Sequence, residues 1–559
     1  MARTMFVMLV AAGLTAQPAQ TPAPTRPATG YGIAGTVVSS VTGQPLAGIT
    51  VAITATNNRQ STQTMETHAD GRFTFDGLLA GKYSLTTVGA RGYHAQGFNQ
   101  HGNYFTGIAV GPNLDAENLM FRLVPDAAIE GTVTDDDNEP VRNASVQLFQ
   151  RNNDTGQHRT QPVSTAASDD RGHYQFGHLV AGTYFVAVSA RPWYAQYGGP
   201  GEPQPDPDNA ARLAEEKAQL NVAYPMTFYP AAEDSSGASP IVLQPGQRAT
   251  ADVVLRTVPA VHLRIKSGEP DEKNAGNTRP GGSFPQLSQR IFEGTLVPIM
   301  SAQSFGLPGG VIEYTGIAPG RYVIEMTAPE SSAAGKRAET GWYKDIDLSG
   351  TVELNANENP PLASVTGAVL LEGARRPAGK IYVVLANRAS GLNFSAEVSD
   401  KGMFDFKDSE IRPGSYDVLL LNAPGFQVKG LLAKGARTVG QTLEISGGGS
   451  VQLVCTATHA VARINGVVLR DDKPFAGAMV VLVPRDPDSN WVLFRRDQSD
   501  SDGTFTLPEV IPGSYTVIAI ENGWDLDWAS PAVLLPYLKN GTPIGLAGEG
   551  KLSVKVQLQ

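Results

Sequence analysis

The sequence predicts an all-β fold: five Greek-key β-sandwich modules in tandem, arranged as a semi-rigid string. The first observation is a sequence motif that recurs five times: a glycine followed by alternating apolar residues, and then Gly-x-Tyr. Glycine and tyrosine lie 12 residues apart in four copies and 14 in the fourth: Gly71 and Tyr83, Gly172 and Tyr184, Gly310 and Tyr322, Gly402 and Tyr416, Gly503 and Tyr515. A repeat of about 100 residues is the size of a small domain.

Each copy begins and ends with a predicted β-strand. Apolar residues alternate at residues 33–37, 129–133, 365–369 and 464–468, which is typical of half-buried strands. The third copy opens at 261–265 without the glycine and is the most degenerate. Closing strands are predicted at 119–123, 253–255, 451–454 and 552–558. One helix is predicted, at residues 209–223, in an insertion of the second copy.

Turn residues and one tyrosine per copy supply the remaining evidence for the fold. Aspartate and glycine fall together at 70–71, 170–172, 400–402 and 502–503. Glycine accepts a positive φ and aspartate closes a local hydrogen bond, so these pairs predict tight hairpins. The tyrosine of Gly-x-Tyr is placed to anchor a chain corner through its hydroxyl group.

These elements predict a division of the chain into seven segments. The ranges are a signal peptide (1–16), a proline-rich leader (17–30), sandwich 1 (31–125), sandwich 2 (126–258, with a helical and aromatic insertion near 193–235), degenerate sandwich 3 (259–361), sandwich 4 (362–459) and sandwich 5 (460–559). The joints between them are short and contain proline, which limits free tumbling.

Composition excludes several classes of function. Charged residues make up 18% of the chain and the net charge is -10, so no basic stripe is available to bind nucleic acid. Cys455 is the single cysteine, which excludes internal disulfides. An apolar run at 5–14 follows Arg3, as in a signal peptide, and no later segment has the ~20 apolar residues of a membrane span. We therefore expect an exported bacterial protein, located in the periplasm, on the cell surface or outside the cell.

The repeated residues resemble a known family. The pattern Gly-Thr-Val, Asp-x-Gly-x-Phe-x-Phe and Pro-Gly-x-Tyr-x-Val is similar to that of the carboxypeptidase regulatory-like domain. The resemblance begins near residue 31 and is clearest in copies one, two and five. It implies a transthyretin-like, Ig-like sandwich of the carbohydrate-binding-like fold, which serves as an auxiliary module on many kinds of protein.

The search for catalytic and metal-binding motifs indicates a protein that is not an enzyme. None of the eight histidines has a glutamate three residues later, as a zinc peptidase would require, and no Gly-x-Ser-x-Gly is present. Residues 498–509 match some positions of a calcium loop, but a glutamine occupies the first position and the turn of the repeat already explains the pattern. No metal and no cofactor are expected.

Aromatic residues between the copies are the better candidates for a binding site. Flat rings on the loops of a rigid sandwich can stack on sugars. The candidates for ligand binding are Trp193, Tyr194, Tyr197, Tyr229, Trp524 and Trp528. The alternative is structural, with the rings closing the open end of a sandwich or burying a joint between modules.

The sequence thus predicts a non-catalytic exported protein that acts as a binding or spacer module, with carbohydrate as the preferred ligand class. A polysaccharide or a cell-envelope protein is the expected partner. Two alternatives stay open: a purely structural rod or adhesin stalk that recognises protein, and an accessory subunit of an envelope enzyme or transporter.

Overall fold

The computed structural model describes residues 30–89, 92–114, 116–197, 219–266, 285–307, 311–326, 342–355, 362–373, 375–387, 393–406, 411–459 and 461–559. The predicted signal peptide lies outside this part of the chain, as does the leader except for Gly30. The described chain is almost entirely β-structure, as predicted, and its strands form pairs of sheets that enclose five hydrophobic cores. We name these pairs sandwiches 1 to 5. The module boundaries stay a prediction.

Sandwiches 1 and 2 share one strand order. Sandwich 1 pairs the sheet β4-β1-β7 with β3-β2-β5-β6: β1 (Tyr31–Ser39), β2 (Thr50–Ala55), β3 (Asn58–Glu66), β4 (Arg72–Leu78), β5 (Gly81–Thr87), β6 (Ile108–Val110) and β7 (Leu119–Leu123). In sandwich 2, one sheet has the order β11-β8-β16, and β17 also pairs with β8. The other sheet has the order β10-β9-β12-β14, and β15 also pairs with β12. The strands are β8 (Ala127–Asp135), β9 (Ser145–Asn152), β10 (Arg159–Ala167), β11 (His173–Leu179), β12 (Gly182–Ser189), β14 (Thr227–Phe228), β15 (Ile241–Leu243), β16 (Arg248–Thr250) and β17 (Val253–Leu255).

Sandwich 3, the predicted degenerate copy, still has two sheets, β22-β23-β19-β26 and β21-β20-β24-β25. Its strands are β19 (Val261–Lys266), β20 (Gln286–Ile291), β21 (Thr295–Pro298), β22 (Gln303–Leu307), β23 (Val311–Ile317), β24 (Gly320–Met326), β25 (Trp342–Leu348) and β26 (Val352–Asn355). A separate two-stranded sheet pairs β13 (Val222–Ala223), from the insertion of sandwich 2, with β18 (Val258–Pro259), in the joint between sandwiches 2 and 3. The 3-10 turn η1 (Ser235–Gly237) lies between β14 and β15 of sandwich 2.

Sandwiches 4 and 5 complete the chain. Sandwich 4 pairs β30-β27-β35-β32 with β29-β28-β31-β34-β33: β27 (Ala363–Glu372), β28 (Ile381–Asn387), β29 (Asn393–Val398), β30 (Met403–Asp405), β31 (Gly414–Leu421), β32 (Gln427–Lys434), β33 (Arg437–Val439), β34 (Thr442–Ile445) and β35 (Gly449–Thr458). In sandwich 5, one sheet has the order β37-β36-β40, and β43 also pairs with β36. The other sheet has the order β39-β38-β41-β42. The strands are β36 (Ala462–Arg470), β37 (Lys473–Pro474), β38 (Met479–Pro484), β39 (Arg495–Gln498), β40 (Thr504–Val510), β41 (Gly513–Ile520), β42 (Thr542–Leu546) and β43 (Gly550–Gln557).

The opening and closing strands of each sandwich pair in parallel. β1 pairs with β7, β27 with β35 and β36 with β43, which confirms the predicted closing strands. A glycine in the opening strand permits the close approach. A Cβ atom on Gly35 would lie 2.2 Å from the carbonyl oxygen of Leu119, and one on Gly367 would lie 1.9 Å from that of Leu453. Gly35 and Gly367 therefore allow an approach of the parallel strands that a side chain at these positions would obstruct.

The tyrosine corner is confirmed in all five copies. Each tyrosine hydroxyl donates a hydrogen bond to the carbonyl oxygen four residues earlier: Tyr83 to Leu79 (3.1 Å), Tyr184 to Val180 (2.9 Å), Tyr322 to Ala318 (2.7 Å), Tyr416 to Arg412 (2.8 Å) and Tyr515 to Ile511 (2.9 Å). Burial raises the pKa of Tyr184 and of Tyr515 to about 12, so both hydroxyls keep their protons.

The aspartate-glycine turns have the predicted backbone but not the predicted connection. The φ angles are +73° at Gly71 and +74° at Gly503, as a tight turn requires. The hairpin prediction is wrong, because the turn at Gly71 joins β3 of one sheet to β4 of the other. Each turn carries the chain across the sandwich. Apolar and polar residues alternate in both strands, so the pattern does not reveal that the chain changes sheet at the turn.

The helix predicted at 209–223 lies mostly outside the described residues, which leaves 209–218 untested. Gln219 and Leu220 are helical, whereas Val222–Ala223 forms strand β13. A further α-helix, which the sequence did not predict, is α2 (Pro531–Leu538); it follows the 3-10 turns η4 (Trp491–Leu493) and η5 (Gly523–Asp525). Proline at its first position suits a helix N-terminus, but Pro536 within it masked the signal.

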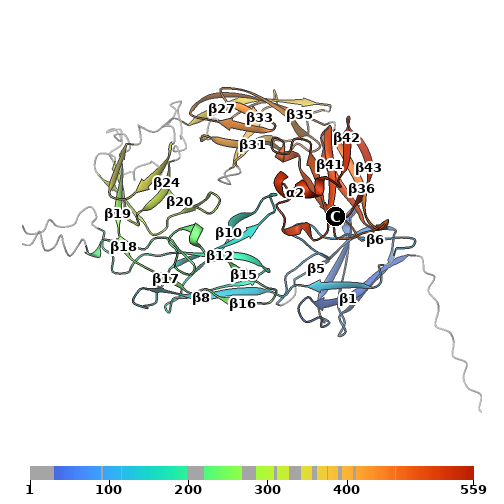
Figure 1. Cartoon of the computed structure of the whole chain (residues 1–559), viewed down its shortest axis with the longest axis horizontal. Helices are drawn as coiled ribbons and strands as arrows, with labels where there is room; N and C mark the ends of the chain where they lie inside the picture. Colours follow the sequence, from blue (N-terminus) through green and yellow to red (C-terminus); the bar gives the residue numbers. More distant parts are fainter. Residues whose placement is uncertain are drawn as a thin grey trace, which may run out of the picture.

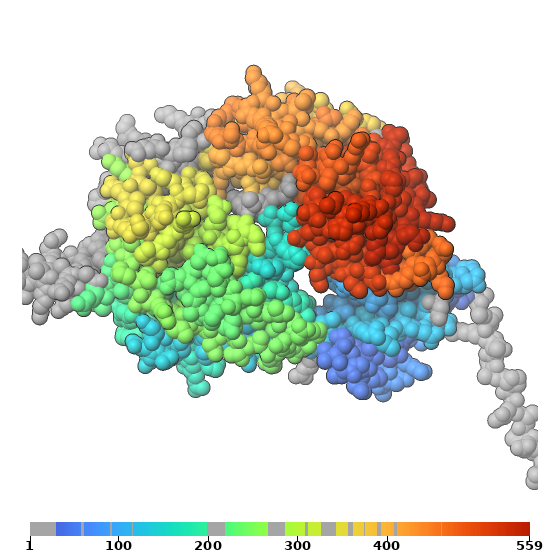
Figure 2. Space-filling model, viewed as in Figure 1, coloured from blue at the N-terminus to red at the C-terminus, as the bar shows by residue number. Residues whose placement is uncertain are grey.

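The sandwiches do not form the open string that the sequence predicts. Sandwich 5 returns to sandwich 1, and Lys82 pairs with Asp500 across 418 residues of sequence. Figure 1 shows the first and last sandwiches side by side, and Figure 2 shows the sandwiches as a ring with a hollowed centre. Short joints set the angle between neighbours, and side chains of the inserted segments then bind modules that are distant in sequence.

Apolar and polar contacts hold the other junctions of the ring. The ring of Phe292, from sandwich 3, lies 5.3 Å from Phe149, 5.1 Å from Phe185 and 5.6 Å from Phe228, all of sandwich 2. Between sandwiches 4 and 5, the Nε2 group of Gln427 donates to Glu509 (2.8 Å). Each junction described here therefore combines chemically specific groups, which favours one closed arrangement.

Candidate functional site

Four of the six predicted ligand-binding residues lie in sandwich 2 and have very different surroundings. Trp193 is 84% exposed, and its ring meets that of Tyr194 edge-on at 5.7 Å. Tyr197 is buried, donates to the carbonyl oxygen of Val222 (2.9 Å) and has a raised pKa because of burial. Tyr229 packs against the core of sandwich 2. Trp193 is thus the most exposed aromatic residue of this group.

Trp524 and Trp528 lie where sandwich 5 meets sandwiches 1 and 2. Trp524 stacks on His101 of sandwich 1, with ring centres 4.7 Å apart and planes 6° apart. Asn153 of sandwich 2 donates to the carbonyl oxygen of Trp524 (2.7 Å), and Trp528 Nε1 donates to that of Asn153 (2.9 Å). This position agrees with the structural alternative, a joint between modules, although the joined modules are not neighbours in sequence. Sugar binding by these two residues stays a prediction.

Arg496 of β39 completes this aromatic junction. Its guanidinium carbon lies 4.6 Å from the ring centre of Trp528, 4.8 Å from that of Tyr104 and 5.5 Å from that of Trp524. Burial lowers the pKa of Arg496, and the negative faces of the rings partly replace the lost water. The cation and the rings thereby link β39, the η5 segment and sandwich 1.

Polar groups at the same junction form a latch, which we define as Gln498, Asp500, Ser501 and Trp524. The carboxylate of Asp500 accepts a hydrogen bond from the amide of Gly107 (2.9 Å) in addition to its ion pair with Lys82. Gln498 Nε2 donates to the carbonyl oxygen of Asn99 (2.7 Å). The stretch that partly resembled a calcium loop is therefore a turn whose side chains bind sandwich 1.

One buried carboxylate beside the latch predicts a pH dependence. Burial raises the pKa of Asp497 to about 6, although its carboxylate accepts a hydrogen bond from the amide of Thr506 (2.7 Å). Because this pKa is higher in the folded protein, folding takes up a proton between pH 6 and 4. The contribution of Asp497 to the free energy of unfolding therefore becomes more favourable as pH falls through that range.

We expect Asp497→Asn to raise the stability of sandwich 5 at pH 7.5 by about 2 kcal/mol and to flatten this part of the pH dependence. Thermal denaturation at pH 7.5 and pH 5 measures the effect. The exposed Asp400→Asn is the matched control and should leave both transitions unchanged. A lower transition temperature of Asp497→Asn at pH 7.5 would contradict the assignment.

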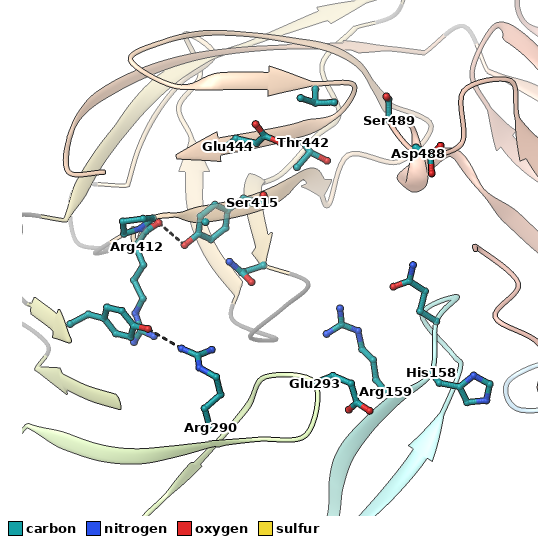
Figure 3. A pocket seen from close by; sticks show the side chains of 17 residues that line it. His158, Arg159, Arg290, Glu293, Arg412, Ser415, Thr442, Glu444, Asp488 and Ser489 are labelled. Carbon is teal, nitrogen blue, oxygen red and sulfur yellow. Dashed lines mark hydrogen bonds between the residues drawn. The ribbon is translucent and has the colours of Figure 1, made fainter. Parts of the chain in front are cut away.

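The centre of the ring contains a polar cavity of ≈ 720 Å³ (Figure 3). Sandwiches 2, 3, 4 and 5 all contribute to its wall. The charged lining residues are Arg159, Arg290, Arg412, Glu293, Glu444 and Asp488, together with His158. Three arginines face three carboxylates, so the cavity has no excess of one charge that would select a strongly ionic ligand.

Sandwich 3 and sandwich 4 build one wall of the cavity around Tyr343. Its hydroxyl accepts a hydrogen bond from Arg290 (2.9 Å) and donates to Asp345 (2.7 Å), and burial raises the pKa of Tyr343 to about 12. The guanidinium of Arg412 lies 4.2 Å from the centre of the Tyr343 ring and pairs with Glu325. These contacts hold both arginines in fixed positions and join the two sandwiches.

Other charged lining residues come from the start of β10, from the turn between β20 and β21, and from β34. Glu293 accepts hydrogen bonds from the amide and hydroxyl groups of Thr160 (2.9 and 3.3 Å), which fixes its carboxylate beside Arg159 in Figure 3. His158 Nδ1 lies 2.5 Å from the carboxylate of Asp527. Glu444 pairs with Arg437 at 3.6 Å. Donors and acceptors therefore both line the cavity, and several of them are held by hydrogen bonds or ion pairs.

The cavity has no single sequence signature. Its residues come from four sandwiches, and no spacing relates Arg159 to Arg412 or Asp488. Among the described residues, no group of three or more His, Cys, Asp or Glu side chains could hold a metal ion. The buried thiol of Cys455 has a pKa raised to about 12 by burial and packs in the core of sandwich 4.

The solved structures to which the chain is similar include two pilins and one other bacterial protein, each at low sequence identity. The TIE protein of Bacillus anthracis is 9% identical, with 96% of this chain and 75% of that chain covered and a TM-score of 0.18. The minor pilin of Streptococcus agalactiae is 12% identical, over 41% and 97% of the two chains, with a TM-score of 0.21. The shaft pilin of Lactobacillus rhamnosus GG is 12% identical, over 41% and 98%, with a TM-score of 0.18.

No curated protein sequence matches the chain. In the part of the chain that the structure describes, we find no helix with the length and apolar character of a membrane span. The carboxypeptidase regulatory-like domain family, a non-catalytic kind of domain, matches residues 32–115 and 128–200. These ranges contain the opening strands, the tyrosine corners and the turn glycines of sandwiches 1 and 2. Two consecutive stretches of the chain, residues 32–115 and 128–200, thus match the carboxypeptidase regulatory-like domain in tandem.

Proposed function

We propose that this protein is a non-catalytic exported binding protein whose ring of sandwiches holds a hydroxyl-rich carbohydrate in its central cavity. The observation that carries the proposal is the cavity wall itself. It contains arginine, amide and hydroxyl donors together with carboxylate acceptors, and the arginines and carboxylates are equal in number. A neutral sugar presents hydroxyl groups that donate and accept at once, so it suits a wall of this mixed character.

Two further features support binding of a carbohydrate over binding of a small ion. The volume of ≈ 720 Å³ is in the range of small-molecule sites and accommodates several sugar rings. Trp193, which is 84% exposed, offers a separate ring on which a longer glycan could stack. The cavity would then supply the polar contacts, and Trp193 an outer contact.

A matched pair of substitutions tests the cavity. Ser415 lines it, whereas Ser514 has the same position in the Gly-Ser-Tyr of the fifth copy and lies outside it. We expect Ser415→Trp to fill part of the cavity and weaken binding of a responsive glycan at least tenfold, with Ser514→Trp unchanged. Isothermal titration with a panel of neutral and acidic polysaccharides measures the affinities of both variants.

Trp193→Ala tests the outer contact separately and should weaken the binding of long glycans more than the binding of short ones. If no glycan binds the folded wild-type chain, or if Ser415→Trp binds as well as the wild type, the carbohydrate proposal fails. A purely structural or adhesin-like role would then be preferred, since a closed ring of non-catalytic domains also suits a rigid spacer. An accessory role in an envelope complex would instead retain a protein partner in a pull-down from envelope extract.

A further inference from the structure

The outer sheet of sandwich 4 exposes an apolar face. Its strand order is β30-β27-β35-β32, and side chains alternate between the core and the outside along each strand. Phe404, Val369, Leu453 and Leu431 are buried in the core of the sandwich. The residues between them point away. The other sheet supplies cavity residues from β31 and β34, so this face lies on the outer margin of the ring, where Figure 1 shows β27 and β35.

Four apolar side chains form one continuous row across this face. Met403 is opposite Ala368, Ala368 is opposite Val454, and Val454 is opposite Leu432. Met403 is 53% exposed and Leu432 is 73% exposed. Leu370, also 53% exposed, lies two residues further along β27 and widens the row. Side chains in register across a sheet form a flat surface that another flat surface can cover.

The same row is mixed in sandwiches 1 and 5, with one apolar residue among polar or charged ones. In sandwich 1 it reads Arg72, Thr36 and Met120. In sandwich 5 it reads Thr504, Val467 and Lys555. Sandwich 4 also adds a fourth strand, β32, which carries Leu432. The repeat architecture therefore does not require an apolar row here, which makes it a specific property of sandwich 4.

Charges beside the row indicate the partner. The neighbouring row reads Asp405, Thr366, Gln452 and Lys434, with a carboxylate at one edge and an ammonium group at the other. A twofold axis along the strands exchanges the two edges of the sheet. It would place Asp405 opposite the partner's Lys434, and Met403 opposite the partner's Leu432. The face is thus complementary to itself.

We propose that the outer face of sandwich 4 binds the same face of a second copy of this chain, with the twofold axis parallel to the strands. The inference does not depend on carbohydrate binding. Four strands at ~4.8 Å spacing and three rows of side chains give a face of about 400 Å². This is half of the ~800 Å² per partner in a standard interface, so the dimer is weak and forms at high local concentration.

Cysteine cross-linking of the full-length protein tests the geometry. Asp405 and Lys434 are three strands apart, about 14 Å, which is too far for a disulfide within one chain. We expect the double variant Asp405→Cys, Lys434→Cys to form an intermolecular disulfide dimer on mild oxidation. Each single variant should cross-link at least tenfold less, because its cysteine faces a lysine or an aspartate of the partner.

Charge exchange provides the second measurement. Sedimentation velocity should show concentration-dependent dimers of the wild type, and Leu432→Asp should abolish them. Asp405→Lys should weaken the dimer about tenfold, and the double variant Asp405→Lys, Lys434→Asp should restore it. Circular dichroism of each variant checks the fold. Monomers at every accessible concentration, equal cross-linking by single and double variants, or failure of the double exchange to restore the dimer would each overturn the proposal.

Discussion

Breaking the latch should open the ring. In the variant Asp500→Lys, Trp524→Ala, the new lysine faces Lys82 in a partly buried site, and the stack on His101 is lost. Removing one partner of a buried charged pair and adding a like charge both disfavour the closed junction. We expect sandwich 5 to leave sandwich 1, with a radius of gyration larger by roughly a third in small-angle X-ray scattering, because a chain of separated domains is less compact than a closed one.

The control for this variant carries the same chemical changes away from the junction. Asp400→Lys, Trp193→Ala replaces an exposed aspartate of the fourth copy and an exposed tryptophan. It should keep the wild-type scattering curve. Circular dichroism should show intact sandwiches in both proteins, since Asp500 and Trp524 lie outside the core that the sheets of sandwich 5 enclose. An unchanged radius of gyration for the latch variant would show that the junction does not hold the ring closed.

Gly367→Ala should strongly destabilise sandwich 4. Its Cβ would lie 1.9 Å from the carbonyl oxygen of Leu453 and 2.6 Å from the Phe404 ring. The first contact is with backbone, so relief requires β27 and β35 to separate along their ten-residue parallel pairing. We expect a loss of about 3 kcal/mol or more in the free energy of unfolding of sandwich 4, as for other severe overpacking.

Gly430→Ala is the matched control within the same sheet. It lies on β32, where a Cβ atom would meet nothing within 4 Å. We expect its effect on unfolding by urea to stay within about 0.5 kcal/mol, as for other exposed sites. Hydrogen exchange of the β27 and β35 amides should rise in Gly367→Ala and not in Gly430→Ala. Equal stability of the two variants would mean that the sheet accommodates the methyl group without strain.

The parts of the fold that sequence predicted are those set by local chemistry. A glycine at positive φ, a strand of alternating residues and a tyrosine that bonds four residues back all depend on near neighbours, so Gly71, Gly503 and the five corner tyrosines could be placed correctly. The change of sheet at each turn could not be predicted from the sequence. Both strands around Gly71 bury one face, and that pattern is the same whether they pair with each other or lie across the core.

The candidate site depended on contacts that leave no trace in spacing. Trp524 and Trp528 stand out in the sequence as aromatic loop residues, but their partners His101 and Asn153 lie more than 370 residues away. Tyr104 could be recognised as an aromatic residue, yet nothing indicates that Arg496 lies over its ring. The central cavity requires the closed ring and therefore could not be expected from any one copy of the repeat.

Closure also changes the cost of losing a domain. In a linear array, a terminal domain has one neighbour, and its removal breaks one junction. Sandwich 5 contacts sandwich 1 through Asp500, sandwich 2 through Trp528 and sandwich 4 through Glu509. Truncation before β36 would expose three surfaces at once and remove Asp488 and Ser489 from the cavity wall. The last sandwich is thus joined to three others, and its loss would be felt in sandwich 1 as much as in its neighbour in sequence.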